Sequence, residues 1–259
     1  MNKTRLRGPH RLAQADWMAS PTPENGYNNG VSNRAYLRVW CREVSEATLP
    51  GLLLKFLATV PFSRTRPGFT QLVLRAIETA EAPVLERDLR SAPTQPAELI
   101  ESLGESLQMD SALELEAWWD LWVYDSSSGL WAEQPQRLEI VCHAPDFEEG
   151  LYREAGHFSA DLGFEHLFTG HAGLLGNGSS ARAALAPQHP AEEEFLRRMS
   201  DAEKLREYAA RTRENIRRLQ GWMQLIAQDV PLARERGLLL TSEGEEDFEA
   251  RLDAIEAQD

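Results

Sequence analysis

The chain has 259 residues, a net charge of −14 at pH 7 and a hydrophobic fraction of 42%, which are values typical of a globular protein. No apolar run approaches the roughly 20 residues of a membrane-spanning helix, and the N-terminal residues lack the apolar segment of a signal peptide. The acidic balance argues against a nucleic-acid partner, because negative side chains repel phosphates.

The first half of the chain shows alternating strand and helix patterns. Residues 1–34 are rich in proline, asparagine and glycine and predict a flexible N-terminal lead-in. Apolar and polar residues alternate over 36–42, which predicts a strand. Apolar residues at intervals of three and four over 45–60 predict a helix. Two further strands are expected within 69–89, and a proline opens a second helix at 96–107.

The strongest pattern lies in residues 112–143. Up to position 124 the odd-numbered residues are uncharged, whereas the even-numbered residues alternate between acids and aromatics. Such alternation predicts a half-buried strand. The turn residues Asp125–Gly129 and a second alternating stretch then complete a β-hairpin. We expect the odd-numbered face to lie in the core, namely Leu113, Leu115, Ala117, Trp119, Leu121 and Val123.

The order strand, helix, strand, strand, helix, strand, strand predicts an α+β fold of the ferredoxin-like kind. We expect an antiparallel sheet that is extended by the hairpin and has helices on one face. This sheet domain is assigned to residues 35–185. A helical C-terminal segment, residues 190–259, is expected to pack on it.

The C-terminal segment carries an apolar stripe over 191–228 at steps of three and four, which predicts one long helix. Apolar residues over 248–255 predict a second helix, so the chain would end in a helical hairpin. We favour covering of the stripe by this second helix. Pairing of the stripe with the same helix of another subunit is the alternative, and it would give a homodimer.

Three histidines, His157, His166 and His171, lie within 15 residues of one another. Zinc sites need three or four ligands that converge on one point, so a metal-dependent hydrolase that uses these histidines is one hypothesis. However, their spacing matches no known ligand signature, and the glycine-rich stretch 170–178 lacks the lysine of a phosphate-binding loop. We therefore predict no metal site, no cofactor and no catalytic residue.

The even-numbered hairpin face is the candidate partner-binding surface. Its members are Glu114, Glu116, Trp118, Asp120, Trp122 and Tyr124. The aromatics are either covered by another part of the chain or form a binding patch. A binding patch is the functional interpretation, because Trp and Tyr are favoured interface anchors and carboxylates select a basic partner.

We interpret the protein as a non-enzymatic, acidic protein-binding module. An inhibitor or immunity-type protein that masks a basic effector protein is one form that such a module takes. The two cysteines, Cys41 and Cys142, are too few for a disulfide framework and predict buried thiols. Buried thiols suit a reducing compartment, so we expect a location in a bacterial cytoplasm.

Overall fold

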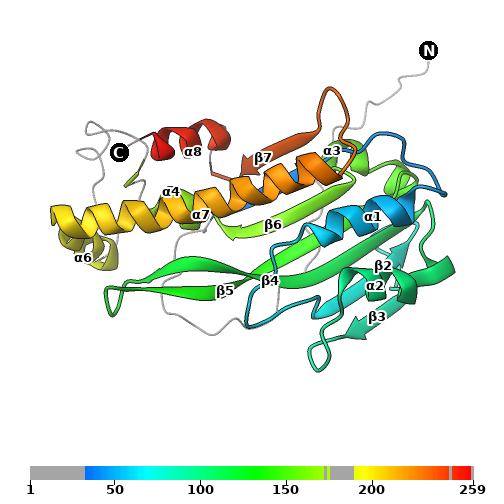
Figure 1. Ribbon diagram of the computed structural model, residues 1–259, viewed down its shortest axis with the longest axis horizontal. Coiled ribbons are helices and arrows are strands. Elements are labelled where there is room, and N and C mark those ends of the chain that lie inside the picture. The colour runs from blue at the N-terminus through cyan, green and yellow to red at the C-terminus, as the bar shows by residue number, and fades with distance from the viewer. Residues whose placement is uncertain (1–32, 172–173, 176–189, 245–246, 258–259) are drawn as a thin grey trace, which may run out of the picture. The chain divides into compact units, whose positions relative to one another are not determined.

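The computed structural model describes residues 33–171, 174–175, 190–244 and 247–257. Seven strands form one sheet in the order β3-β2-β4-β5-β6-β1-β7, and each strand pair of the described residues is antiparallel (Figure 1). The strands are β1 (Arg34–Val39), β2 (Gln71–Ala76), β3 (Leu85–Asp88), β4 (Ser111–Asp125), β5 (Leu130–His143), β6 (Phe158–Phe164) and β7 (Leu238–Ser242). The predicted α+β class is therefore confirmed.

The described helices connect and cover these strands. They are α1 (Leu49–Ala58), α2 (Pro96–Leu103), α3 (Tyr152–Ala155), α4 (His166–Thr169), α6 (Pro190–Met199), α7 (Ala202–Asp229) and α8 (Phe248–Glu256). Two short 3-10 turns, η1 (Gly104–Ser106) and η2 (Phe147–Glu149), lie between them. Figure 1 shows α1 and α7 in front of the sheet.

The ferredoxin-like arrangement is not confirmed. A split βαβ unit contains parallel strands, whereas β1 pairs antiparallel with β6 on one side and with β7 on the other. Strand β7 comes from the C-terminal segment 190–259, which the sequence predicted to be helical. It begins with Leu238–Leu240, a short apolar run, and such a run fits a strand as well as a helix. The sheet thus extends beyond the predicted domain 35–185.

The hairpin and its buried face are confirmed. Trp119 and Leu121 of β4 are at most 1% exposed. Trp119 lies edge-on to Trp222 of α7, with 6.0 Å between the ring centroids. Phe56 of α1 stacks on Phe158 of β6 at 4.3 Å. The odd-numbered face of β4 therefore packs in a core that α1 and α7 complete.

The single helix predicted for 191–228 is wrong, because the chain breaks between α6 and α7. Asp201 adopts an extended backbone there, and its side chain accepts hydrogen bonds from the backbone N–H groups of Glu203 and Lys204. An aspartate in this position caps the start of a new helix. The apolar spacing continues across the break, so periodicity alone could not show it.

The apolar stripe of α7 is buried within the chain itself. Ile216, Leu219 and Ile226 are 0% exposed. Helix α8 packs beside α7, where Gln220 donates a hydrogen bond to Glu256 at 2.6 Å. These three side chains are therefore buried against other parts of the same chain.

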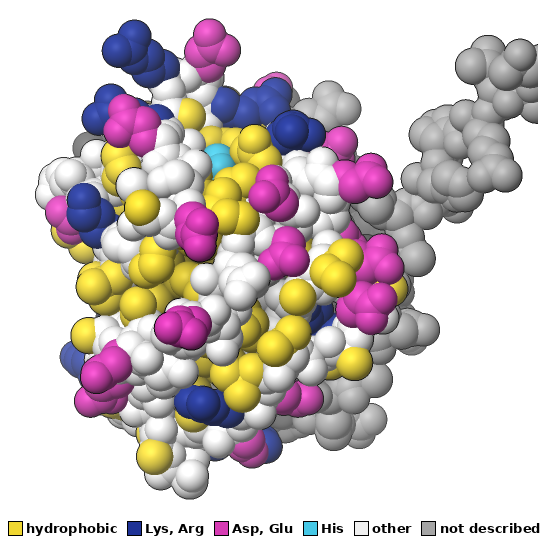
Figure 2. All heavy atoms as spheres, turned by 90° about the vertical axis from the view of Figure 1, so that its right-hand side faces the viewer, with side chains coloured by type: hydrophobic (Ala, Val, Ile, Leu, Met, Phe, Trp, Pro, Cys, Tyr) yellow, Lys and Arg dark blue, Asp and Glu magenta, His cyan; other side chains and the backbone are white. Residues whose placement is uncertain are grey.

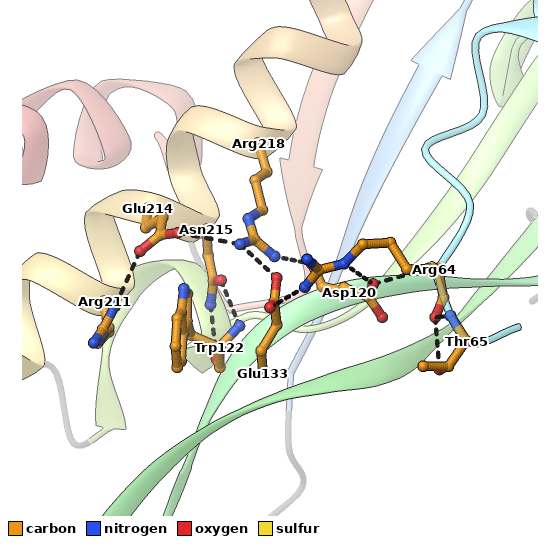
Figure 3. A network of polar contacts seen from close by, with 10 residues as sticks. Arg64, Thr65, Asp120, Trp122, Glu133, Arg211, Glu214, Asn215 and Arg218 are labelled. Carbon is orange, nitrogen blue, oxygen red and sulfur yellow. Dashed lines mark hydrogen bonds and ion pairs between the residues drawn. The ribbon is translucent and has the colours of Figure 1, made fainter.

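Helix α7 also closes an unpaired edge of β4. Strand β2 pairs with β4 only over Ser111–Glu116, so the rest of β4 lacks a strand on that side. The buried amide of Asn215 accepts a hydrogen bond from the Trp122 N–H at 2.8 Å and donates one to the Trp122 carbonyl at 2.9 Å. It also donates to the Leu167 carbonyl. Asn215 thereby replaces the neighbouring strand (Figure 3).

We predict that Asn215→Ala lowers the free energy of unfolding by about 2–4 kcal/mol, because it leaves buried backbone groups of Trp122 and Leu167 without partners. Urea unfolding measures this change. Glu203→Ala, on the exposed side of the same helix, should change the free energy by less than about 0.5 kcal/mol. Equal effects of the two substitutions would contradict the edge role of Asn215.

Candidate functional site

Each carboxylate of the predicted hairpin patch is ion-paired with an arginine. The pairs are Glu114–Arg75 at 2.7 Å, Glu116–Arg137 at 2.7 Å and Asp120–Arg64 at 3.5 Å. Burial alone would raise the pKa of Asp120, but hydrogen bonds from Ser63 and Arg64 outweigh it and hold that pKa below its ordinary value. The negative charge of this patch is therefore largely compensated within the chain.

The aromatic residues of the patch are also covered. The guanidinium of Arg66 lies 4.3 Å from the Trp118 ring centre, and that of Arg211 lies 3.8 Å from the Trp122 ring centre. Both distances are those of cation–π contacts. Trp118 and Trp122 remain partly exposed.

Tyr124 of the predicted partner-binding face is buried and does not belong to an exposed patch. It is 9% exposed and packs against Trp131 of β5, Phe195 of α6 and Tyr208 of α7. These helices cover the end of the hairpin on the face that carries Tyr124. The alternation pattern predicts which face of the strand carries a residue, but it does not predict which other element covers that face.

The three histidines of the metal hypothesis are not brought to one point. His166 and His171 stack with ring centroids 4.0 Å apart. His157 precedes the other end of β6, where its Nδ1 accepts a hydrogen bond from the Cys41 N–H. Within the described ranges no group of three or more His, Cys, Asp or Glu side chains could hold a metal ion. The geometry therefore gives the hydrolase hypothesis no support.

Burial keeps several histidines uncharged. It lowers the pKa of His171 to about 4. It also lowers the pKa of His157 to about 4, and the nearby His143 lowers it further. In the unfolded chain a histidine has a pKa near 6.5. Below that pH the unfolded state binds protons that the folded state does not, so acid favours unfolding.

We predict that the free energy of unfolding falls as the pH is lowered from about 6.5 to about 4, the window between the unfolded and folded pKa values of these histidines. Urea unfolding at several pH values measures the loss. NMR titration of the imidazole C–H signals assigns it, with the chain in concentrated urea as the reference. A folded-state pKa of His171 at or above the urea value would contradict this reading.

A second surface lies where five connecting segments meet at one end of the sheet. We call it the loop end, and it consists of residues 40–48, 77–84, 104–110, 144–157 and 231–237. Backbone hydrogen bonds join these segments. The Ile77 N–H donates to the Asp110 carbonyl and the Glu148 N–H donates to the Ile77 carbonyl, both at 2.8 Å, while the Arg42 N–H donates to the Pro231 carbonyl.

The loop end carries an excess of negative charge. Its sequence contains eleven carboxylates and four guanidinium groups, a net of −7 in a chain of net −14. The acids are Glu43, Glu46, Glu78, Glu81, Glu105, Asp110, Asp146, Glu148, Glu149, Glu154 and Glu235. None of them forms an ion pair with another described residue.

Sequence reasoning missed this surface. The acids are visible as polar residues between predicted elements, and that is an ordinary loop composition. Their convergence depends on which strands pair, because pairing decides which loops meet at the same end. Figure 2 faces this end and shows acidic side chains among and around apolar ones.

Backbone strain and two exposed apolar side chains also lie in the loop end. Among described residues other than glycine, only Glu43, Ile77, Glu148 and Glu149 have a positive φ, and all four lie here. Ile77 has φ +71° and is 62% exposed, and Val84 is 61% exposed. A β-branched residue in this conformation is strained, and such strain clusters at functional sites.

A small, partly open hollow of about 10 Å³, with room for about one water molecule, lies between the loop end and the first turns of α1. Its walls are mostly apolar and its polar members include two imidazoles. They are formed by Val44, Leu49, Leu52, Leu53, Leu107, Ser111, Cys142, His143, Ala144, His157 and Phe158. The loop end thus combines an acidic surface with an apolar depression.

Comparison of the chain with protein-family models, with curated proteins and with solved structures finds no match in any of the three. Among the helices of the described residues, none is both long enough and apolar enough to cross a membrane.

Proposed function

We propose that the protein is a non-enzymatic binding module for a protein with a basic surface, and that the loop end holds this partner. The observation that carries the proposal is the set of eleven loop-end carboxylates without ion pairs. Uncompensated carboxylates on one end produce a directed negative potential. Such a potential accelerates encounter with a basic protein and orients its docking.

The hairpin patch predicted from the sequence stays a second candidate surface for the same partner. Trp118 and Trp122 are partly exposed, and tryptophan and arginine are residue types that dominate binding energies at interfaces. Its carboxylates are ion-paired, however, so a basic partner would have to displace arginines in order to use them. The loop end requires no such exchange.

An inhibitor or immunity-type role fits these features, because a module of this kind masks a basic effector by charge and shape. The two thiols fit a cytoplasmic location. Cys41 and Cys142 are free and buried, and burial raises the pKa of Cys41 to about 12. A thiol with such a pKa reacts little at neutral pH.

The test compares two variants with the same change of charge. The loop-end variant carries Glu46→Lys, Glu78→Lys, Glu81→Lys and Glu154→Lys. The control variant carries Glu203→Lys, Glu207→Lys, Glu249→Lys and Asp253→Lys on α7 and α8. All eight side chains are exposed and form no ion pair with described residues.

We expect wild type and control to capture the same basic proteins from a lysate of the source cells, released by moderate salt, and the loop-end variant to lose them. Quantitative mass spectrometry of the eluates measures this. Retention by the loop-end variant would refute the assignment to the loop end. If Trp118→Ala alone removed the captured proteins, the hairpin patch would be the binding surface instead.

A further inference from the structure

We propose that a second copy of this chain pairs with the free edge of β7, so that two sheets join into one continuous sheet. This inference goes beyond the proposed function and concerns a different surface, because the loop end holds the basic partner whereas β7 joins two copies. Strand β7 lies at one border of the sheet and β3 lies at the other (Figure 1).

The free edges of β3 and β4 are protected against a further strand. Strand β3 is short, and its residues 86–88 are all charged and exposed. The free part of β4 is closed by Asn215 and Arg218 of α7, whose side chains bind its backbone. Charged residues on a short strand and a covering helix are both devices that prevent pairing at an edge.

The free part of β5 is protected by a proline. Strand β6 pairs with β5 only over Glu139–Cys142, so residues 130–138 lack a strand on that side. The odd-numbered residues of β5 direct their backbone groups to this side, since the N–H of His143 donates to the segment before β6. Pro135 is one of them and has no N–H to donate, and its carbonyl accepts a hydrogen bond from the Gln136 side chain.

The edge of β7 has no such protection. Its residues Leu238–Ser242 contain neither a charge nor a proline, and all of them except Leu240 are partly exposed. A strand of this composition at the border of a sheet is a template for pairing with another strand.

The pairing of β7 with β1 shows which backbone groups are free. The Trp40 N–H donates to the Gly237 carbonyl, and hydrogen-bonded and non-hydrogen-bonded pairs alternate from there along the antiparallel ladder. The residues whose N–H and C=O groups point away from β1 are therefore Leu238, Leu240 and Ser242. No hydrogen bond joins these backbone groups to another described residue.

The free edge is complementary to itself. Antiparallel pairing that is centred on Leu240 places Leu238 opposite Ser242 of the second copy. Such pairs exchange two hydrogen bonds each, and they use the backbone groups that point outward. Because the paired strands run in opposite directions, the two loop ends lie at opposite ends of the joined sheet and both stay open to the basic partner.

The charges at the two ends of β7 favour a second copy as the occupant. Arg236 precedes the strand and Glu243 follows it, and both are exposed. Neither forms an ion pair with another described residue. Antiparallel self-pairing brings Arg236 of each copy beside Glu243 of the other, and opposite charges on neighbouring strands stabilise their pairing. A uniformly basic strand would instead meet Arg236 with like charge.

Sedimentation velocity of the full chain tests the inference at concentrations of about 1–100 µM and a salt concentration of about 0.15 M. Salt at this level screens the repulsion between two copies of net charge −14. We expect wild type to change from monomer to dimer over this range. Leu239→Lys puts a charge on the partly exposed outer side of the edge and should raise the dissociation constant about tenfold or more. Arg87→Glu, on the exposed strand β3, should leave it unchanged.

An exchange of charges tests the antiparallel arrangement. Arg236→Glu and Glu243→Lys each place like charges at both ends of the paired strands, so each variant alone should dimerise about tenfold more weakly than wild type. An equimolar mixture of the two variants should regain the dimer, because both ends of the mixed pair then carry opposite charges. Local damage to the fold in either variant would not produce this rescue.

A wild type that stays monomeric at every concentration overturns the inference. Dimers that persist in Leu239→Lys, or a mixture that regains no dimer, overturn it as well. Dissociation caused by Arg87→Glu would assign the contact to β3 instead. Thermal unfolding verifies that each variant is folded. These outcomes are independent of the loop-end partner, which the capture from lysate tests separately.

Discussion

The side-chain amide of Asn215 joins the longest helix to the one stretch of β4 that has no neighbouring strand. Two hydrogen bonds to the Trp122 backbone and one to the Leu167 carbonyl fix α7 across the hairpin. Trp222 of the same helix packs in the core beside Trp119. Helix α6 packs against α7 and, through Phe195, against Tyr124 of β4, while α8 packs against both α7 and β7. The closure of this strand edge thus contributes to the position of α7 and of the helices beside it.

Arginines extend this closure along the strand. Arg218 of α7 donates to the Asp120 carbonyl and also pairs with Glu133 of β5 at 2.7 Å. Arg64, from the loop after α1, pairs with Asp120 and Glu133 as well (Figure 3). A guanidinium can bind a carbonyl and a carboxylate at once, because its donors point in several directions. These arginines hold the loop and the helix to the hairpin, and Arg64 also neutralises Asp120, one of the acids that the sequence assigned to a partner.

Which features the sequence could predict depends on how far apart along the chain the interacting residues lie. The hairpin and the burial of Trp119 rest on local alternation, which residues a few positions apart determine. The addition of β7 to β1 depends on contacts across the length of the chain, such as the hydrogen bond between Tyr36 and Glu243. Periodicity carries no information about such pairs.

The break at Asp201 is a different case, because its signal was present in the sequence. Aspartate is a preferred helix cap, but the continuous apolar spacing around it favoured an uninterrupted helix. At the candidate site, the sequence identified Trp118 and Trp122 but could not show that Arg66 and Arg211 cover them. The loop end was invisible for the same reason as β7, since Ile77 meets Asp110 and Glu148 only through strand pairing.

The two charged surfaces differ in how far their charges are paired and their apolar groups are buried within the chain. On the hairpin face, acids are matched by arginines, and Tyr124 is packed among other rings. At the loop end, eleven carboxylates outnumber four guanidinium groups and repel one another, and Ile77 is both strained and exposed. The ion pairs of the hairpin face show that this fold can place arginines beside carboxylates. Carboxylates without ion pairs at the loop end do not stabilise the fold. A basic partner would offset the repulsion between them and cover the exposed apolar side chains.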